Sequence, residues 1–163
     1  MGFTSFCLRP GFSLVVGERG SGKTGILAAI GREAREQGSH VIMVGMEPSF
    51  DPRFAGWAWT NYSEPSLFWR DVVKGVEADV FLIGDFSELA MNLLEDQEDR
   101  GRGLGSSARA ARSLADELHS RAIQNNFFVV AEFPTSMRDV VAEFPTRIEL
   151  RYPCIKAHQS GGL

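Results

Sequence analysis

The residues with the clearest chemistry form one unbroken stretch near the N-terminus. It combines three glycines with a lysine and a threonine: Gly17, Glu18, Arg19, Gly20, Ser21, Gly22, Lys23 and Thr24. This is the G-x-x-x-x-G-K-T spacing, in which backbone N–H groups of a glycine-rich loop surround nucleotide phosphates. In that setting Lys23 reaches the β- and γ-phosphates and Thr24 binds Mg²⁺. The stretch therefore predicts a site for ATP and Mg²⁺.

The segments on either side supply the context that this loop needs. The apolar run at 12–16 predicts a buried strand, and residues 23–37 predict a helix that stops at Gly38. A loop between a strand and a helix presents its N–H groups at the helix N-terminus, where the partial positive charge favours anions. The alternative, a chance glycine-rich turn, would not require this context.

Three carboxylates follow other apolar runs. Asp85 comes after the run at 80–83 and is expected to join the Mg²⁺ shell. Glu47 ends the second predicted strand and would polarise the water that attacks the γ-phosphate, unless it is an ordinary residue before a proline turn. For Glu132 three roles are compatible with the sequence: it senses the γ-phosphate, it links the nucleotide to the next loop, or it is only a polar strand end.

The apolar runs alternate with helical patterns along the chain. Strands are predicted at 12–16, 40–44, 80–83, 127–131 and 148–152, and helices at 23–37, about 65–77, 86–96 and 107–124. This rhythm predicts an α/β fold with a parallel sheet covered on both faces. Ligands bind such sheets outside the carboxyl ends of the strands, where the loop and the three acids lie.

Two further segments stand out. Residues 48–69 hold seven aromatic side chains: Phe50, Phe54, Trp57, Trp59, Tyr62, Phe68 and Trp69. Packing of an irregular excursion onto the sheet edge is the main interpretation, with a subunit interface or a base-stacking surface as alternatives. The sequence Val-Val-Ala-Glu-Phe-Pro-Thr occurs at 129–135 and again at 140–146. It is too short for a solenoid unit, and its duplication has no evident physical reason.

Length and composition limit the number of domains and the kinds of partner and compartment. The 163 residues predict a single domain, 1–163, and the net charge of −4 neither supports nor excludes nucleic acid. Cys7 and Cys154 form no metal-ligand spacing and no disulfide framework. Because no stretch has the length of a membrane span, no membrane association is expected. The cytoplasm is the simplest compartment, meaning the host cytoplasm or the virion if the chain is viral.

Taken together, the loop and the carboxylates resemble those of RecA-like P-loop ATPases, most closely the motor domain of hexameric replicative helicases of the DnaB type. The matching segments are Leu8-Arg9-Pro10-Gly11 with Leu14, 41–49 with Glu47, 82–89 with Asp85, and 113–132. The resemblance implies a mostly parallel central sheet with helices on both faces. It also implies a homo-oligomeric ring, a hexamer being favoured, with ATP between neighbouring subunits and nucleic acid in a central channel.

By position, two loops match the channel loops of that family. The segment 95–107 carries Arg100 and Arg102, and the segment 133–146 carries Arg138. Arginines on glycine-rich backbone suit phosphate contacts, although solvated polar loops would have the same composition.

Two departures from the family also follow from the comparison. The segment between Glu47 and Val80 is shorter than in the helicases, and His158 stands where the family has an arginine that reaches into the neighbour's ATP. Arg147, Arg151 or Lys156 could take the place of this arginine finger.

Three functions are compatible with these features. The first is a compact Mg²⁺-dependent ATPase that forms a ring and moves nucleic acid, as a helicase or viral packaging motor. The second is an ATP-dependent regulatory or assembly module that binds protein, which stimulation of ATPase by nucleic acid would distinguish from the first. The third is a small-molecule kinase with a lid at 99–105 and a substrate pocket in the aromatic segment. The position of Glu47 after the second strand favours water activation over the kinase.

Overall fold

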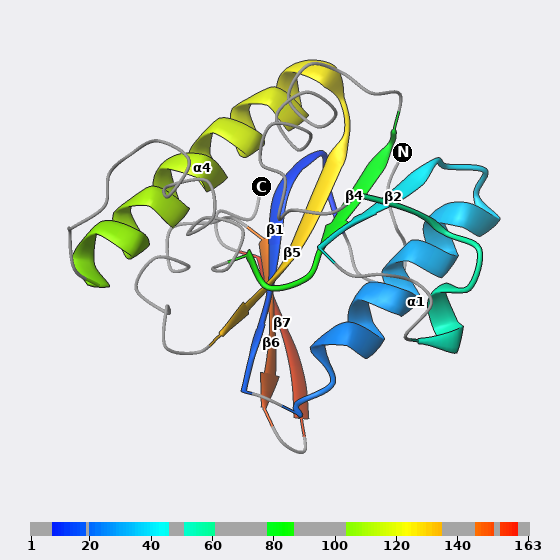
Figure 1. Ribbon diagram of the computed structural model, residues 1–163, viewed down its shortest axis with the longest axis horizontal. Coiled ribbons are helices and arrows are strands. Elements are labelled where there is room, and N and C mark those ends of the chain that lie inside the picture. The colour runs from blue at the N-terminus through cyan, green and yellow to red at the C-terminus, as the bar shows by residue number, and fades with distance from the viewer. Residues whose placement is uncertain are drawn as a thin grey trace.

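The computed structural model describes residues 8–18, 20–45, 51–60, 78–86, 104–134, 146–151 and 154–159. For residues 60, 104–111, 134, 146–151 and 154–159 it describes the backbone alone. These residues form an α/β structure around one sheet (Figure 1). The strands are β1 (Gly11–Gly17), β2 (Val41–Val44), β3 (Ala58–Thr60), β4 (Val80–Ile83), β5 (Phe128–Pro134), β6 (Thr146–Arg151) and β7 (Cys154–Gln159).

The described strands lie in the order β3-β2-β4-β5-β1-β6-β7. Every neighbouring pair is parallel except β6 and β7, which pair antiparallel at one edge. The prediction of a mostly parallel sheet is therefore confirmed. The strand β5 lies between β1 and β4, so the strand that leads into the glycine-rich loop and the strand before Asp85 are both its neighbours.

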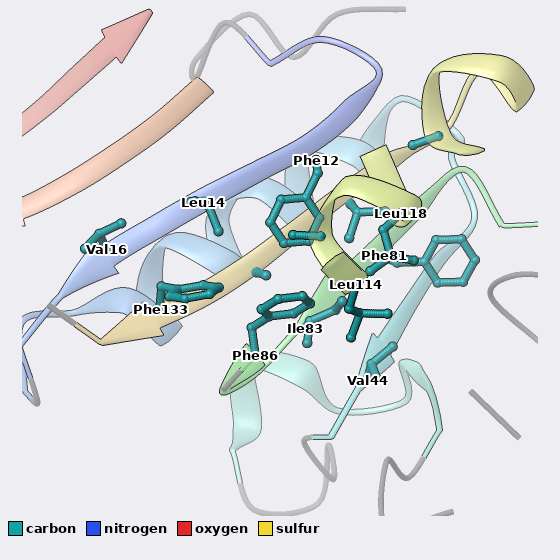
Figure 2. Packing of buried hydrophobic residues seen from close by; sticks show 14 residues of the cluster. Phe12, Leu14, Val16, Val44, Phe81, Ile83, Phe86, Leu114, Leu118 and Phe133 are labelled. Atoms are coloured by element: carbon teal, nitrogen blue, oxygen red, sulfur yellow. The ribbon is translucent and has the colours of Figure 1, made fainter. Parts of the chain in front are cut away.

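A helix covers each face of the sheet, as predicted (Figure 1). The helix α1 (Lys23–Glu36) packs on the face that carries Val15, and α4 (Leu104–Asn125) packs on the face that carries Leu14 and Val16. Figure 2 shows the hydrophobic core between α4 and the sheet, where side chains of α4 pack against those of the central strands. Successive residues of a strand point to opposite faces. A central strand covered on both faces therefore needs a nearly continuous apolar run, which β1 has apart from the buried Ser13.

The end of α1 follows the predicted stop signal. The helix ends at Glu36, and Gly38 adopts a left-handed conformation with φ of 83°. The N–H of Gly38 donates to Arg35 O at 3.0 Å and that of Ser39 to Ala34 O at 2.9 Å. These bonds satisfy carbonyls that the last helical turn would leave unpaired.

The aromatic segment is described in part, and there it packs onto the sheet edge, as its main interpretation predicts. A short 3-10 helix (Pro52–Phe54) leads to the edge strand β3, and both elements were missed by the sequence patterns. The side chains of Phe54 and Trp57 are buried in the core beneath α1, whereas Trp59 is 44% exposed. The other aromatic residues of this segment lie outside the described residues.

Other expectations fall partly outside the described residues. The helix predicted at 65–77 lies wholly outside, and that at 86–96 lies outside except for Phe86. The strand predicted at 148–152 is found at Thr146–Arg151, followed by β7, which was not predicted. Among the described helices, none has the length and apolar character needed to cross a membrane.

Candidate nucleotide-binding site

The glycine-rich loop turns from β1 into α1 through two left-handed residues. Gly20 has a φ of 79° and Gly22, the residue that caps α1, has a φ of 94°. Such angles are costly for residues with a Cβ, which explains the glycine at both positions. Within the described part of the chain no side chain caps this end of α1, and the first turn of the helix holds no acid. The first N–H groups of the helix are therefore presented to an anion without a competing carboxylate.

Lys23 lies over the loop. Its ammonium Nζ donates to Gly17 O at 2.7 Å and to Glu18 O at 2.8 Å. The N–H of Ser21 also donates to Glu18 O at 3.1 Å, which closes the loop into a turn. These contacts hold the positive charge of Lys23 against the backbone of the loop.

Ser21 provides a polar atom that finds no partner among the described residues. Its hydroxyl Oγ is buried and makes no hydrogen bond to another described residue. Buried hydroxyl groups are nearly always hydrogen-bonded in folded proteins. An orphaned donor inside the turn is what a loop that binds phosphate oxygens would have, so this atom fits the expected ligand.

Thr24 connects the loop to the far end of β5. Its hydroxyl Oγ1 donates to Glu132 Oε1 at 2.9 Å, across 108 positions of the sequence. The backbone explains the contact, because β5 runs parallel to β1 with Glu132 in register with Val15. Thr24 begins the helix that follows β1, so a long side chain on β5 can reach it.

Burial and three neighbouring residues shift the pKa of the Glu132 carboxyl group. The residue is only 9% exposed, and burial raises the pKa of its carboxyl group. The hydrogen bond from Thr24 and the charge of Lys23 lower this pKa, while the charge of Asp85 raises it. Glu132 therefore lies within electrostatic reach of three residues that the sequence assigned to phosphate and metal binding.

Asp85 occupies a strained position directly after β4. Its φ of 36° lies in the left-handed region, which a residue with a side chain adopts only at a cost of about 1–3 kcal/mol. Buried neighbours hold it there: the N–H of Gly84 donates to Val44 O at 3.0 Å. The ring of Phe86 lies 5.0 Å from that of Phe12 in the core. The exposed carboxylate of Asp85 is thus presented at the carboxyl edge of the sheet.

The oxygen atoms of Thr24 and Asp85 suit Mg²⁺ better than they suit a metal that binds protein side chains alone. No group of three or more histidine, cysteine, aspartate or glutamate side chains in the described part of the chain could hold an ion. Mg²⁺ keeps several waters and usually takes one or two carboxylates together with substrate phosphates. Thr24 and Asp85 beside a phosphate loop match that pattern, so the residues present fit the metal.

For several predicted residues, the structure describes no side chain. Five of them, Arg19, Glu47, Arg100, Arg102 and Arg138, lie outside the described residues. Arg147 and Arg151 are on β6, beside β1, and Lys156 is on β7, with only their backbone described. Leu150 of β6 pairs with Gly17, the first residue of the loop, and Arg151 is the next residue of β6.

One residue near the site was missed by the sequence patterns. A Cβ added to Gly25, directly after Thr24, would lie 3.2 Å from Nη1 of Arg53. The only local signal is Asp51-Pro52, a pair that starts the short helix, with the Asp51 carboxylate accepting from the N–H of Arg53 at 3.0 Å. That signal predicts a turn and says nothing of the residue against which the turn packs.

The sequence was compared with known proteins. No protein-family model matches it. No curated protein is significantly similar to it.

Proposed function

We propose that this protein is a Mg²⁺-dependent ATPase of the RecA-like P-loop type. The observation that carries the proposal is the hydrogen bond from Thr24 to Glu132, with the charges of Lys23 and Asp85 close enough to shift the pKa of the same carboxyl group. A phosphate loop beside carboxylates from two other strand ends is the arrangement that nucleotide hydrolysis requires. The order β4-β5-β1 supports the proposal because it brings these residues to one edge of the sheet.

Each residue has a separate task in this proposal. The loop N–H groups and the Ser21 hydroxyl bind phosphate oxygens, and Lys23 exchanges its two carbonyl partners for the β- and γ-phosphates. Thr24 and Asp85 hold Mg²⁺, which would neutralise charge on the β- and γ-phosphates when bound. Glu47 takes the role of orienting and polarising the attacking water.

The larger function that we propose is a ring-forming motor that acts on nucleic acid. It is supported by the resemblance to the helicase motor domains, with Arg100, Arg102 and Arg138 on the segments that match the channel loops. In such rings an arginine of the neighbouring subunit stabilises the transferred phosphate. Arg147, Arg151 and Lys156 are the proposed substitutes for that arginine.

Nucleotide titration of two variants tests the site. We expect Lys23→Ala to lose ATP binding while its circular dichroism and melting temperature stay near those of the wild type, because it removes the charge that faces the phosphates. Glu47→Gln should bind ATP and Mg²⁺ normally but stop turnover, since the amide keeps the shape and loses the base. Affinity of Lys23→Ala within a few-fold of the wild type would contradict the site assignment.

A further inference from the structure

The segment 51–57 is fixed against α1 by two aromatic anchors. Phe54 is 1% exposed and Trp57 is 9% exposed, and their rings meet edge to face with centroids 5.0 Å apart. Trp57 also fills the space beside Gly31, where an added Cβ would lie 2.4 Å from the indole ring. On the outer side, the guanidinium of Arg35 stacks on Trp57 at 5.0 Å. The path of this segment along α1 is therefore set by packing.

This path brings Arg53 to the first turn of α1. Nη1 of Arg53 is the atom that an added Cβ at Gly25 would meet. Gly25 is the third residue of α1, and helical N–H groups this close to the N-terminus have no partner within the helix. The guanidinium consequently lies beside the first turn of α1, whose N–H groups belong to the proposed nucleotide site.

The side chain of Arg53 is held but not buried. Its Nη2 donates to Asp51 Oδ2 at 2.6 Å, and its Nε is 3.0 Å from each carboxylate oxygen. The side chains of Arg53 and Asp51 are 45% and 26% exposed. Ion pairs this exposed contribute little to stability, so the guanidinium can share a second anion or exchange one for another at small cost. The ion pair with Asp51 then keeps the guanidinium group of Arg53 in a fixed orientation.

We propose that Arg53 binds phosphate oxygens of the nucleotide held by the loop at residues 17–24. The inference rests on the proposed nucleotide site and adds to it a cation from the same chain, on the element that follows β2. Arginine keeps its charge at all physiological pH values and can bind two oxygens at once. Because Arg53 would contact only the phosphates, it would raise the affinity for both ATP and ADP and leave recognition of the base unchanged.

Equilibrium titration with fluorescent ATP and ADP analogues, with and without Mg²⁺, tests this role. We expect Arg53→Ala to weaken binding about 10- to 100-fold, the usual effect of losing a charge-assisted hydrogen bond. Arg53→Lys should fall between Arg53→Ala and the wild type, because it keeps the charge and loses the fork. The salt dependence of affinity should decrease in Arg53→Ala, since one cation fewer meets the phosphates.

Arg35→Ala is the matched control, because it removes another arginine that contacts the same segment, near the opposite end of α1. We expect wild-type affinity from it. Equal weakening by Arg35→Ala and Arg53→Ala would show that only the packing of the segment matters, and would overturn the proposal. Wild-type affinity of Arg53→Ala together with loss of binding in Lys23→Ala would also overturn it, while leaving the nucleotide site intact. Binding by Lys23→Ala and Arg53→Ala alike would remove the site itself.

Discussion

The Thr24 hydroxyl donates its one hydrogen bond to the Glu132 carboxylate, which comes from another strand. With the hydroxyl hydrogen directed to Glu132, the lone pairs of Oγ1 are left for a cation. The contact differs from the sensor role predicted for Glu132, which concerned the γ-phosphate and stays a prediction. At this scale the carboxylate of Glu132 orients the hydroxyl that we propose as a Mg²⁺ ligand.

Substitution of Glu132 separates its charge from its hydrogen bond. Glu132→Gln keeps an acceptor for Thr24, whereas Glu132→Ala removes it and leaves the hydroxyl free to rotate. We expect both variants to bind ATP as the wild type does in the presence of a chelator. The gain in affinity on adding Mg²⁺ should be about 10-fold smaller in Glu132→Ala than in Glu132→Gln, as expected for one lost hydrogen bond. Calorimetric titration in both buffers measures the difference, and identical gains would show that Thr24 needs no such partner.

At the scale of elements, close contacts fix how each helix meets the sheet. Gly31 lets Trp57 and Leu82 approach α1 so closely that an added Cβ would lie 2.4 Å from the indole ring and 2.8 Å from Leu82 Cδ1. On the opposite face, the N–H of Phe12 donates to Nδ1 of His119 at 2.9 Å and ties the start of β1 to α4. Both helices are thereby positioned by single residues in addition to their apolar faces.

Gly31→Ala should destabilise the protein although alanine favours helix more than glycine does. The new methyl group overlaps the ring of Trp57, and overpacking of this kind costs about 1–3 kcal/mol in the free energy of unfolding. Urea denaturation measures this loss. In a Trp57→Leu background the same substitution should cost clearly less, because the smaller side chain leaves room for the methyl group. An equal cost in both backgrounds would place the clash elsewhere.

His119 should make stability depend on pH. Burial lowers the pKa of its imidazole below the usual 6.5, although the charge of Asp116 raises it. Between these two pKa values the unfolded chain binds more protons than the folded one, so stability rises with pH in that window. The contribution is present above pH 6.5 and is lost as the pH falls through the pKa of the folded protein. Protonation would also remove the acceptor that Phe12 uses.

Comparison with His119→Asn isolates this effect, because the amide oxygen can accept from Phe12 and does not titrate. We expect the free energy of unfolding of the wild type to fall more than that of the variant between pH 7.5 and pH 5. Denaturant titrations at several pH values measure both curves. Parallel curves would mean that His119 does not contribute to acid sensitivity.

For the whole molecule, the proposed site lies at the carboxyl edge of a sheet whose outer strands are β3 and β7. A motor would have to join this edge to a neighbour and to nucleic acid. If it does, light scattering should show a larger assembly, a hexamer being favoured, in the presence of a non-hydrolysable ATP analogue and Mg²⁺.

Replacing Arg100, Arg102 and Arg138 together by alanine tests the polymer contact. Binding of RNA or DNA should weaken and its dependence on salt should decrease, while nucleotide affinity and basal ATPase stay near wild type. Filter binding at several salt concentrations measures the slope. Unchanged affinity and slope would exclude these arginines as the contact. A wild type that neither assembles nor binds nucleic acid would remove the motor function and leave the ATPase.

The sequence by itself determined what is local. The glycines at 20 and 22 specify a tight turn between β1 and α1, the period of apolar residues specifies α1 and the central strands, and Gly38 marks the end of a helix. Such features depend on neighbours a few positions away. Glu47 and the arginines of the loops were predicted in the same way and stay predictions.

Only the tertiary structure decided which strand ends meet. Buried parallel strands all have similar apolar runs, so their sequences predict that strands exist and not which of them pair. The insertion of β5 between β1 and β4 brings Glu132 to Thr24, and the burial of Phe54 and Trp57 brings Arg53 to Gly25. Both contacts join residues far apart in the chain, and they arise from the packing of side chains that carry no chemistry of their own.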